Sequence, residues 1–379
     1  MNDNLAGGVQ LSLMIGPAVP IPVSKAIIDA LQSVTVTSTA FGTSGFELTF
    51  ALDTKSPLQT LFLLGGGVAI PLVRVVIAAT LNGRTDVLMD GVMTDHQMDT
   101  NAKDGSATLT IVGEDLTRVM DYLDFSGLPF PAMPAEAQVA IALIKYAIFG
   151  VIPMIIPSIL IDIPLPIDRI PRQKGTDLKH VRRLASQVGY VFYLDPGPIP
   201  GTSVAYWGPP IKWGPVQPAL AVDADASTNV ESLQFTFNNE HRTLPIVIVQ
   251  EPTTKLPIPI PVGNISPLNP PLGLIPPIPK NIDIIKGGAK WSVVRAALIA
   301  MAKAAKSADA ITASGSLDVQ RYGRILKARH LVGVRGSGTA FDGLYYVKSV
   351  THEIKRGSYK QRFGLSRNGL VSTVSSVPA

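Results

Sequence analysis

Cysteine is absent from the 379 residues of this chain, and charged residues are scarce, at 16% against 46% apolar residues. Without cysteine the chain has no disulfide and no thiolate metal site, which fits assembly in a reducing cytoplasm and also fits some secreted proteins. The apolar content is high enough to offset chain entropy by burial, so the sequence predicts folded cores. The first residues, MNDNLAGG, carry an acid where a secretory signal carries bases, and we expect no signal peptide.

Catalytic motifs are also missing. No serine has glycine two positions to either side, no glycine-rich loop ends in Lys-Ser or Lys-Thr, and no glycine run has the dinucleotide-binding spacing. We therefore predict a protein that is not an enzyme and has no catalytic residue, no cofactor and no metal site. The histidines have no partner at metal-ligand spacing; they are His96, His180, His241, His330 and His352.

One cluster leaves a cation site open as an alternative. Asp90, Asp95, His96 and Asp99 lie close together in the sequence, and hard cations bind carboxylate oxygens. The cluster lacks a dedicated loop motif, and a run of this kind is more often a solvated loop.

Strand patterns dominate residues 1–125, which we assign to a first β domain. The run from Phe46 to Leu52 alternates apolar and polar residues, the period of a half-buried strand. Asn82-Gly83 is a strong signal for a two-residue hairpin. From Glu114 to Met120, acids at the start and apolar residues three to four apart predict a short helix.

Helices enter in residues 126–229, which we assign to an inserted α+β domain. An apolar helix is predicted over Ala135 to Tyr146, and Thr176 caps a second helix that ends at Gly189. A predicted hairpin follows, with strands at residues 190–194 and 203–207.

An apolar run within this domain raises the question of a membrane span. Val139 to Ile161 is long enough to cross a bilayer. Lys145, Pro153 and Pro157 interrupt it, and proline breaks the hydrogen bonding that a spanning helix needs. We expect a buried helix followed by an apolar loop, and no stable membrane insertion.

Residues 230–250 and 312–372 are assigned to a second, discontinuous β domain. The alternating run Leu233 to Phe237 and the run Ile246 to Val249 predict strands that pair with the C-terminal meander. Residues 251–311 are predicted to be an insertion. Its first part, Pro252 to Pro279, has ten prolines in 28 residues, which predicts an extended loop, and Lys290 to Ala308 predicts a helix.

The C-terminal meander is strongly basic. Residues 321–367 contain eleven Lys and Arg against two acids, a local charge of +9 in a chain whose net charge is +5. Two interpretations remain open: a docking face or channel wall for an acidic partner, and a solvated strand face. For the first, we select basic residues at predicted strand ends and turns as candidate partner contacts: Arg335, Lys355, Arg356 and Lys360.

A weak internal repeat links the two β domains. Residues 91–96, GVMTDH, precede a Gly-Ser turn, a strand and Gly113, while residues 349–352, SVTH, precede Gly357-Ser358, a strand and Gly364. Two copies of one barrel would explain this match.

The C-terminal residues resemble the tail-hub proteins of contractile phages and injection systems, which include the late-control D type and the hub part of valine-glycine-repeat spike proteins. The resemblance rests on ARHLVGVRG at 328–336, FDGLYYVKSVTH at 341–352, GSYKQRF at 357–363 and LSR at 365–367. Weaker likenesses at 91–96, 113–116, 176–193 and 229–235 extend it to nearly all the chain apart from the proline-rich insertion.

This resemblance implies a mainly β fold with α+β insertions, in which two tube-like β-barrel domains occur in each subunit of a homotrimer. Three chains would form a pseudo-sixfold ring around a central channel, with a tail tube protein above, a spike protein below, other baseplate proteins nearby, and cargo or DNA passing transiently. Spike fusions continue into further domains and this chain stops at Ala379, so the expected spike is a separate protein. The expected location is a virion or injection particle assembled in the bacterial cytoplasm.

Two other functions remain as alternatives. The apolar run at 139–161 would suit a membrane-associated pore or anchor. A cell-wall-acting tail-tip enzyme would need a pair of carboxylates in a cleft.

Overall fold

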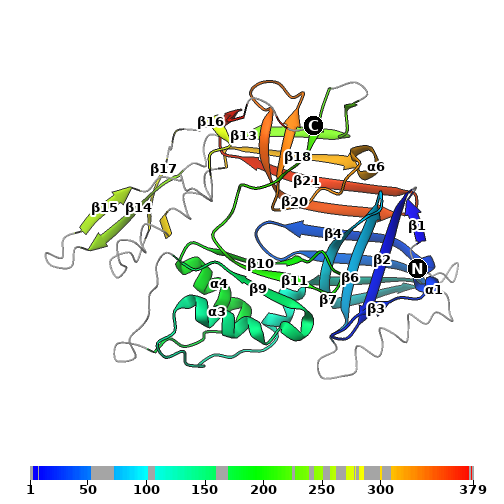
Figure 1. Cartoon of the computed structure of the whole chain (residues 1–379), viewed down its shortest axis with the longest axis horizontal. Coiled ribbons are helices and arrows are strands. Elements are labelled where there is room, and N and C mark those ends of the chain that lie inside the picture. The colour runs from blue at the N-terminus through cyan, green and yellow to red at the C-terminus, as the bar shows by residue number, and fades with distance from the viewer. Residues whose placement is uncertain are drawn as a thin grey trace.

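The structure, a computed structural model, is mainly β with helical insertions, as the sequence predicts (Figure 1). The strands in the described part of the chain form one large, mostly antiparallel sheet and three small ones. The residues that it describes are 3–6, 8–52, 72–100, 107–158, 170–223, 227–238, 243–250, 257–261, 270–276, 278, 281–285, 299–300, 309–374 and 377.

The N-terminal strands alternate in burial as their sequence predicts. In β5 (Gly45–Leu52), Phe46, Leu48 and Phe50 are buried, and the residues between them are not. Asn82 and Gly83 have φ of 52° and 78° and form the predicted two-residue turn. The elements of this part are β1 (Asp3–Ala6), β2 (Val9–Gly16), β3 (Ile21–Pro22), α1 (Lys25–Ala30), β4 (Leu31–Thr39), β5, β6 (Arg74–Leu81), β7 (Arg84–Thr100) and β8 (Ala107–Asp115).

The C-terminal strands join the same sheet. β13 pairs with β18, and β18 pairs with β21, so the prediction that residues 233–237 pair with C-terminal strands is confirmed. The elements are β12 (Val216–Ala221), β13 (Ser232–Phe237), β18 (Ile311–Asp318), α6 (Val319–Tyr322), β19 (Leu331–Arg335), β20 (Gly343–Lys355), β21 (Ser358–Arg367) and β22 (Leu370–Ser372).

The two β halves are continuous with each other. The main sheet runs β1-β2-β6-β7-β8-β5-β4-β20-β21-β18-β13, and the pairing of β4 with β20 joins the halves. Figure 1 shows β13, β18, β21, β20 and β4 stacked in this order. One hydrophobic core contains side chains from both halves, including Leu48, Ile77, Tyr345 and Leu365. The boundaries of the two predicted barrel domains remain a prediction.

The inserted unit, residues 116–208, has a separate core. Leu116, Val139, Val181 and Trp207 are all buried in it. The predicted helix at 114–120 is the 3-10 helix η2, and Asp115 accepts a hydrogen bond from Thr117 N at its start. The elements are η2 (Leu116–Asp121), α3 (Ala135–Ile144), η3 (Ala147–Phe149), β9 (Val151–Ile155), α4 (Asp177–Gln187), β10 (Val191–Pro196) and β11 (Ser203–Gly208).

The proline-rich insertion corrects the sequence prediction, because it contains strands. β14 (Thr243–Gln250) does not join the C-terminal meander; its described partners are β15 (Pro257–Pro261) and β17 (Asn281–Ile285). β15 has proline at every second position and lies at the sheet edge. Successive N–H groups of a strand point to opposite sides, so the missing ones all fall on one side and the isoleucine N–H groups on the other side can pair. Alternation of proline with isoleucine is what allows a strand here.

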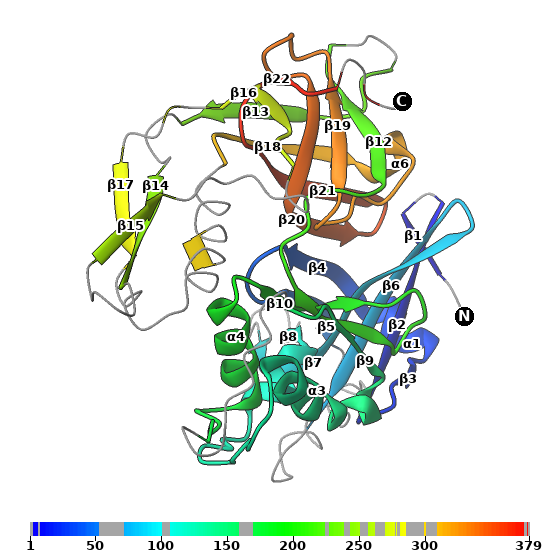
Figure 2. The ribbon, with the colours of Figure 1, turned by 60° about the vertical axis from the view of Figure 1, so that its left-hand side comes forward.

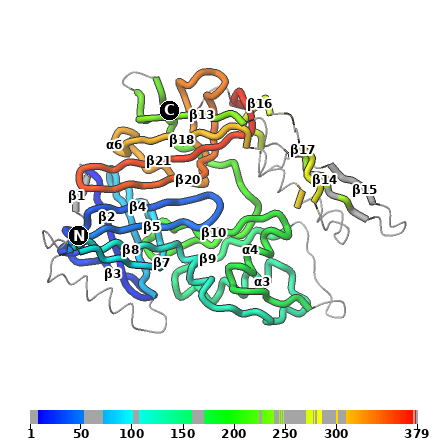
Figure 3. The backbone as a smooth tube through the Cα atoms, turned by 180° about the vertical axis from the view of Figure 1, so that it is seen from behind, coloured from blue at the N-terminus to red at the C-terminus, as the bar shows by residue number. Residues whose placement is uncertain are grey.

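This three-stranded sheet, β15-β14-β17, is called the arm below. Figures 1, 2 and 3 all show it apart from the main sheet and from α3 and α4. β16 (Gly273–Ile275), which lies between β15 and β17 in the sequence, is not part of the arm and pairs with β22. The predicted helix at 290–308 lies outside the described residues except for 299–300, which are helical.

Candidate assembly interface

One four-stranded unit occurs twice in the main sheet. In the first copy the order is β7-β8-β5-β4, and in the second it is β20-β21-β18-β13. Each copy consists of two antiparallel pairs, β4-β5 and β7-β8 in the first copy and β13-β18 and β20-β21 in the second. In each copy the second strands of the two pairs lie side by side, β5 next to β8 and β18 next to β21. The weak sequence repeat thus corresponds to a repeated topology.

A phenylalanine opposite a glycine fixes the alignment of the two copies. Phe46 pairs with Gly113 in the first copy, and Phe363 pairs with Gly315 in the second. The rings leave no room for a Cβ atom, which would lie 2.3 Å from the ring of Phe46 at Gly113 and 2.7 Å from that of Phe363 at Gly315. The residue equivalent to Gly113 is therefore Phe363, one position before the Gly364 that the sequence repeat suggests.

From this alignment, His96 and His352 occupy the same place in the two copies. His96 lies opposite Ile111, two residues before Gly113, and His352 lies opposite Gln361, two residues before Phe363. Both strands also have a bulge nearby, at 93–95 in β7 and at 347–349 in β20. The bulges lie two residues before His96 and four residues before His352, so they do not align between the copies, and the equivalence rests on the phenylalanine–glycine pairs.

Within the chain, the two copies meet edge to edge. The second half of β20, from Ser349 to Lys355, pairs with β4 antiparallel. The outward-facing hydroxyls of Thr37 and Thr351 lie 3.1 Å apart across this junction, while Val36 and His352 are buried beneath it. The junction thus has a packed inner face and a polar outer face.

The junction strands β4 and β20 are equivalent to β13 and β7 in the other copy. β13 and β7 lie at the two ends of the eight-strand array, and β13 and the second half of β7 are solvent-exposed. In the second half of β7, every residue from Thr94 to Thr100 is exposed, although the equivalent residues of β20 are mostly covered. β13 is the last strand of the sheet, and none of its residues is buried. Among the described residues no strand pairs with β7 beyond Val92 on that side, nor with the outer side of β13. Exposed edges of this kind are templates for strand pairing.

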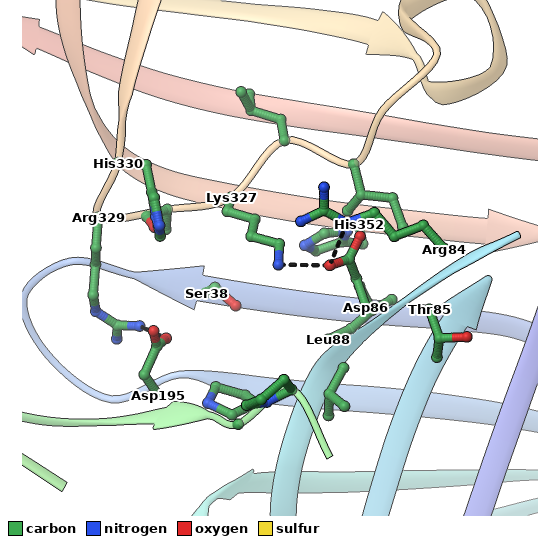
Figure 4. Close-up of a pocket in the computed structure, with 17 residues that line it drawn as sticks. Ser38, Arg84, Thr85, Asp86, Leu88, Asp195, Lys327, Arg329, His330 and His352 are labelled. Carbon is green, nitrogen blue, oxygen red and sulfur yellow. Dashed lines mark hydrogen bonds and ion pairs between the residues drawn. The ribbon is translucent and has the colours of Figure 1, made fainter. Parts of the chain in front are cut away.

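A pocket of about 380 Å³ lies where both halves and the inserted unit meet (Figure 4). Lys327 Nζ lies 2.6 Å from Asp86 Oδ1, and Arg329 Nη1 lies 2.7 Å from Asp195 Oδ1. Arg329 also donates to the carbonyl of Thr39 at 2.6 Å. These contacts join the segment before β19 to β7, β10 and β4, so two cations of the basic meander act inside the chain.

Other basic residues of the meander are also engaged within the chain. Arg367 is buried and donates to the carbonyl oxygens of Ala340, Asp342 and Gly369. Burial lowers the pKa of this guanidinium, and its contacts hold the loop before β20. Arg362 pairs with Glu353. The +9 of the meander therefore overstates its exposed charge.

The four candidate partner contacts do not form one cluster. Lys355 and Arg356 are exposed at the turn between β20 and β21, where Arg356 donates to the carbonyl of Asp29. Lys360 lies nearby on β21, with its Nζ 2.6 Å from Glu231 Oε1. Arg335 lies at the opposite end of the meander, because β19 pairs with the first residues of β20.

Two histidines, His352 and His180, are buried in the fold. His352 Nδ1 lies 2.8 Å from the hydroxyl of Tyr359 and 3.2 Å from Gln361 Nε2. Burial lowers the pKa of His352 to about 3. In the inserted unit, burial and the neighbouring Arg183 lower the pKa of His180 to about 4. Both rings are therefore neutral near pH 7.

The candidate cation cluster is divided by the fold. Asp90 is buried and accepts two hydrogen bonds from Arg74, at 2.8 and 2.6 Å. Asp95, His96 and Asp99 lie instead on the exposed half of β7. Within the described ranges, no group of three or more His, Asp or Glu residues has the geometry of a metal site.

No protein-family model matches this sequence, and no curated protein matches it either. Two solved structures with a similar fold are tail proteins. The tail protein from Neisseria meningitidis MC58 has a TM-score of 0.62 at 14% identity, covering 96% of this chain and 98% of that one. The 43 kDa tail protein of prophage MuSo2 from Shewanella oneidensis has a TM-score of 0.62 at 13% identity, with 95% and 98% covered.

A chain of the half-lidded Francisella PdpA-VgrG complex is also similar, with a TM-score of 0.60 at 9% identity. The match covers 100% of this chain and 61% of that one. These likenesses establish the fold, which is that of a phage tail protein. None of the helices in the described part of the chain has the length and apolar character needed to cross a bilayer.

Proposed function

We propose that this chain is a structural hub of a contractile tail or injection system, and that it acts without catalysis. Three copies form a ring of six four-stranded units around a central channel. The ring joins a tail tube protein on one side to a separate spike protein on the other, within the baseplate. The fold shared with tail proteins supports this proposal.

The observation that carries the proposal is the junction between β4 and β20. It is a head-to-tail contact, in which the first strand of one unit meets the third strand of the next. Repetition of such a contact gives a ring when the rotation closes. Each chain contains this contact once, between β4 and β20. The equivalent strands, β13 and the exposed half of β7, are then available to pair with neighbouring chains.

The alignment of the copies predicts the register of the contact between chains. Val36 is equivalent to Leu233, because they lie opposite Phe46 and Gly315. Since Val36 pairs with His352, His96 of one chain lies opposite Leu233 of the next. By the same step, Asp95 lies opposite Gln234, as Thr351 lies opposite Thr37.

The basic turn fits a position at the rim of this ring. Lys355 and Arg356 are exposed at the end of β20, and the ring repeats them around its axis. Such a concentration of like charge is destabilising unless acidic groups face it. We assign these two residues, with Lys360 and Arg335 as weaker candidates, to contacts with acidic residues of the tube, the spike or another baseplate protein.

Copurification tests the hub role. The chain is coexpressed with the tube and spike proteins encoded beside its gene, and the complexes are analysed by light scattering after gel filtration. We expect a species with three times the 40.2 kDa of one chain that retains both partners. A trimer that binds neither partner would contradict the hub role, and a monomer would contradict the ring.

A further inference from the structure

The arm presents an apolar face that the described part of its own chain leaves partly uncovered. In the parallel pairing of β14 with β17, Leu244 lies beside Ile282 and Ile246 beside Ile284. Residues beside each other in register project from the same face of a sheet. Ile282 and Ile284 are 67% and 54% exposed, and Leu244, Ile246 and Ile248 are only half-buried.

Such a face needs a cover. A three-stranded sheet is marginal in water unless its apolar face packs against something, and contiguous exposed aliphatic side chains indicate an interaction surface. In all three views the arm lies apart from α3 and α4 (Figures 1, 2 and 3). Since neither of these two helices covers the face, we look for its cover on another molecule.

The position of the arm in the sequence identifies that molecule as a second copy of this chain, an inference that rests on the proposed ring. β14 begins at Thr243, six residues after β13 ends at Phe237. β13 is the strand that meets the neighbouring copy. The arm thus extends from the edge at which two copies meet.

The register of that edge shows which part of the neighbour lies closest. Leu233 would lie opposite His96 in an antiparallel pairing, so Phe237, four residues later, would lie near Val92 of the neighbour. Val92 pairs with Arg74 at the start of β6. Val92 is buried in the core of the inserted unit. The base of the arm therefore arrives at the inserted unit of the next copy.

That unit carries a matching surface. Ile141, Ile144 and Ile148 are spaced by three and four residues along α3 and into η3, and all are exposed, Ile144 and Ile148 to 69% each. We call these three residues the aliphatic ridge. We propose that the apolar face of the arm in one copy packs against the aliphatic ridge of the next copy, and so clasps the ring.

Cross-linking between differently tagged copies tests this contact, and the cysteine-free sequence means that only introduced thiols react. Copies with Ile284→Cys are coexpressed with copies carrying Ile144→Cys and treated with a short bismaleimide. We expect a cross-linked pair containing both tags. The matched control replaces Ile144→Cys by Ile199→Cys, an isoleucine of the same unit that is 64% exposed but lies outside the ridge; it should give little product.

A second measurement covers the case in which the thiols are badly oriented. The double variant Ile282→Asp with Ile284→Asp should dissociate at a protein concentration about tenfold higher than the wild type, or more, because two buried aliphatic contacts are lost. Ile199→Asp should not change dissociation. A wild-type trimer whose dissociation is unaffected by the double variant, with equal cross-linking at Ile144 and Ile199, would overturn the arm contact. A monomeric wild type would instead overturn the ring.

Discussion

A glycine opposite a phenylalanine recurs in both four-stranded units, with the two residues exchanged between strands. At Gly113, a Cβ atom would lie 2.3 Å from the ring of Phe46 and 2.4 Å from the carbonyl oxygen of Val92. The ring can therefore cover the backbone only if that position has no side chain. This contact explains a residue whose importance the sequence indicated only through a repeat.

Replacement of Gly113 by alanine should destabilise the chain. The added methyl group overpacks a buried site, which costs about 1 to 3 kcal/mol. Urea unfolding measures the loss. Gly364→Ala is the matched control, because there the new Cβ would meet only the side-chain hydroxyl of Ser349, which can rotate away; a loss as large as that of Gly113→Ala would contradict the packing explanation.

The buried histidines predict acid sensitivity. His352 and His180 have folded-state pKa values of about 3 and about 4, both below the usual value near 6.5. The unfolded state therefore binds protons first as the pH falls below about 6.5, and stability is lost from there down to the folded-state pKa. At pH 5 the loss is about 2 kcal/mol for each histidine.

Urea unfolding at pH 7 and pH 5 measures this dependence. His352→Gln removes one of the two titrating groups, so its stability should fall less between the two pH values than that of the wild type. An unchanged difference in the variant would mean that other groups cause the acid sensitivity.

At the scale of elements, the hairpins and helix caps were predictable because their signals are local. Asn82-Gly83 specifies a two-residue turn by its own backbone preference, and Thr176 caps α4 by accepting a hydrogen bond from Lys179 N. The edge strand β15 was not predicted, because the prediction considered the number of prolines and not their alternate positions. Prolines at alternate positions leave the other N–H groups free to pair.

Charge partners were not predictable in the same way. The sequence shows that the meander is basic, but the acids that neutralise it, such as Asp86 for Lys327 and Asp195 for Arg329, come from strands far away in the chain. The sheet edges proposed for assembly could not be predicted for the same reason. The exposure of β7 from Thr94 onward, and the side of β13 that pairs with no described strand, depend on which strands pair, which only the fold determines.

The turn between β20 and β21 should matter for assembly and little for folding. Exposed charges contribute little to stability, so Lys355→Glu with Arg356→Glu should leave the melting temperature nearly unchanged and reduce the yield of assembled particles. Lys174→Glu with Lys179→Glu, which reverses two exposed charges of the inserted unit, serves as control. Particle yield unchanged by the first pair would favour a solvated strand face.

At the scale of the whole molecule, one contact within the chain is the basis of the proposed assembly. The chain folds as two four-stranded units joined by β4 and β20, and the same contact between chains would extend them to a closed ring. In the chain order the inserted unit lies between the two four-stranded units, and the arm interrupts the second unit between β13 and β18. The arm contact proposed above would connect the two insertions across the subunit boundary. The tail-protein fold provides the array, and the insertions adapt it.

Disulfide trapping between chains tests the ring most directly. Asp95→Cys with Gln234→Cys places thiols at the positions equivalent to Thr351 and Thr37, whose hydroxyls are 3.1 Å apart. Oxidation should give a covalent trimer on a non-reducing gel, while each single variant stays monomeric there. Thr37→Cys with Thr351→Cys should form its disulfide within one chain and so confirm the geometry. If this control oxidises and the Asp95→Cys, Gln234→Cys protein gives no covalent trimer, the proposed ring is wrong.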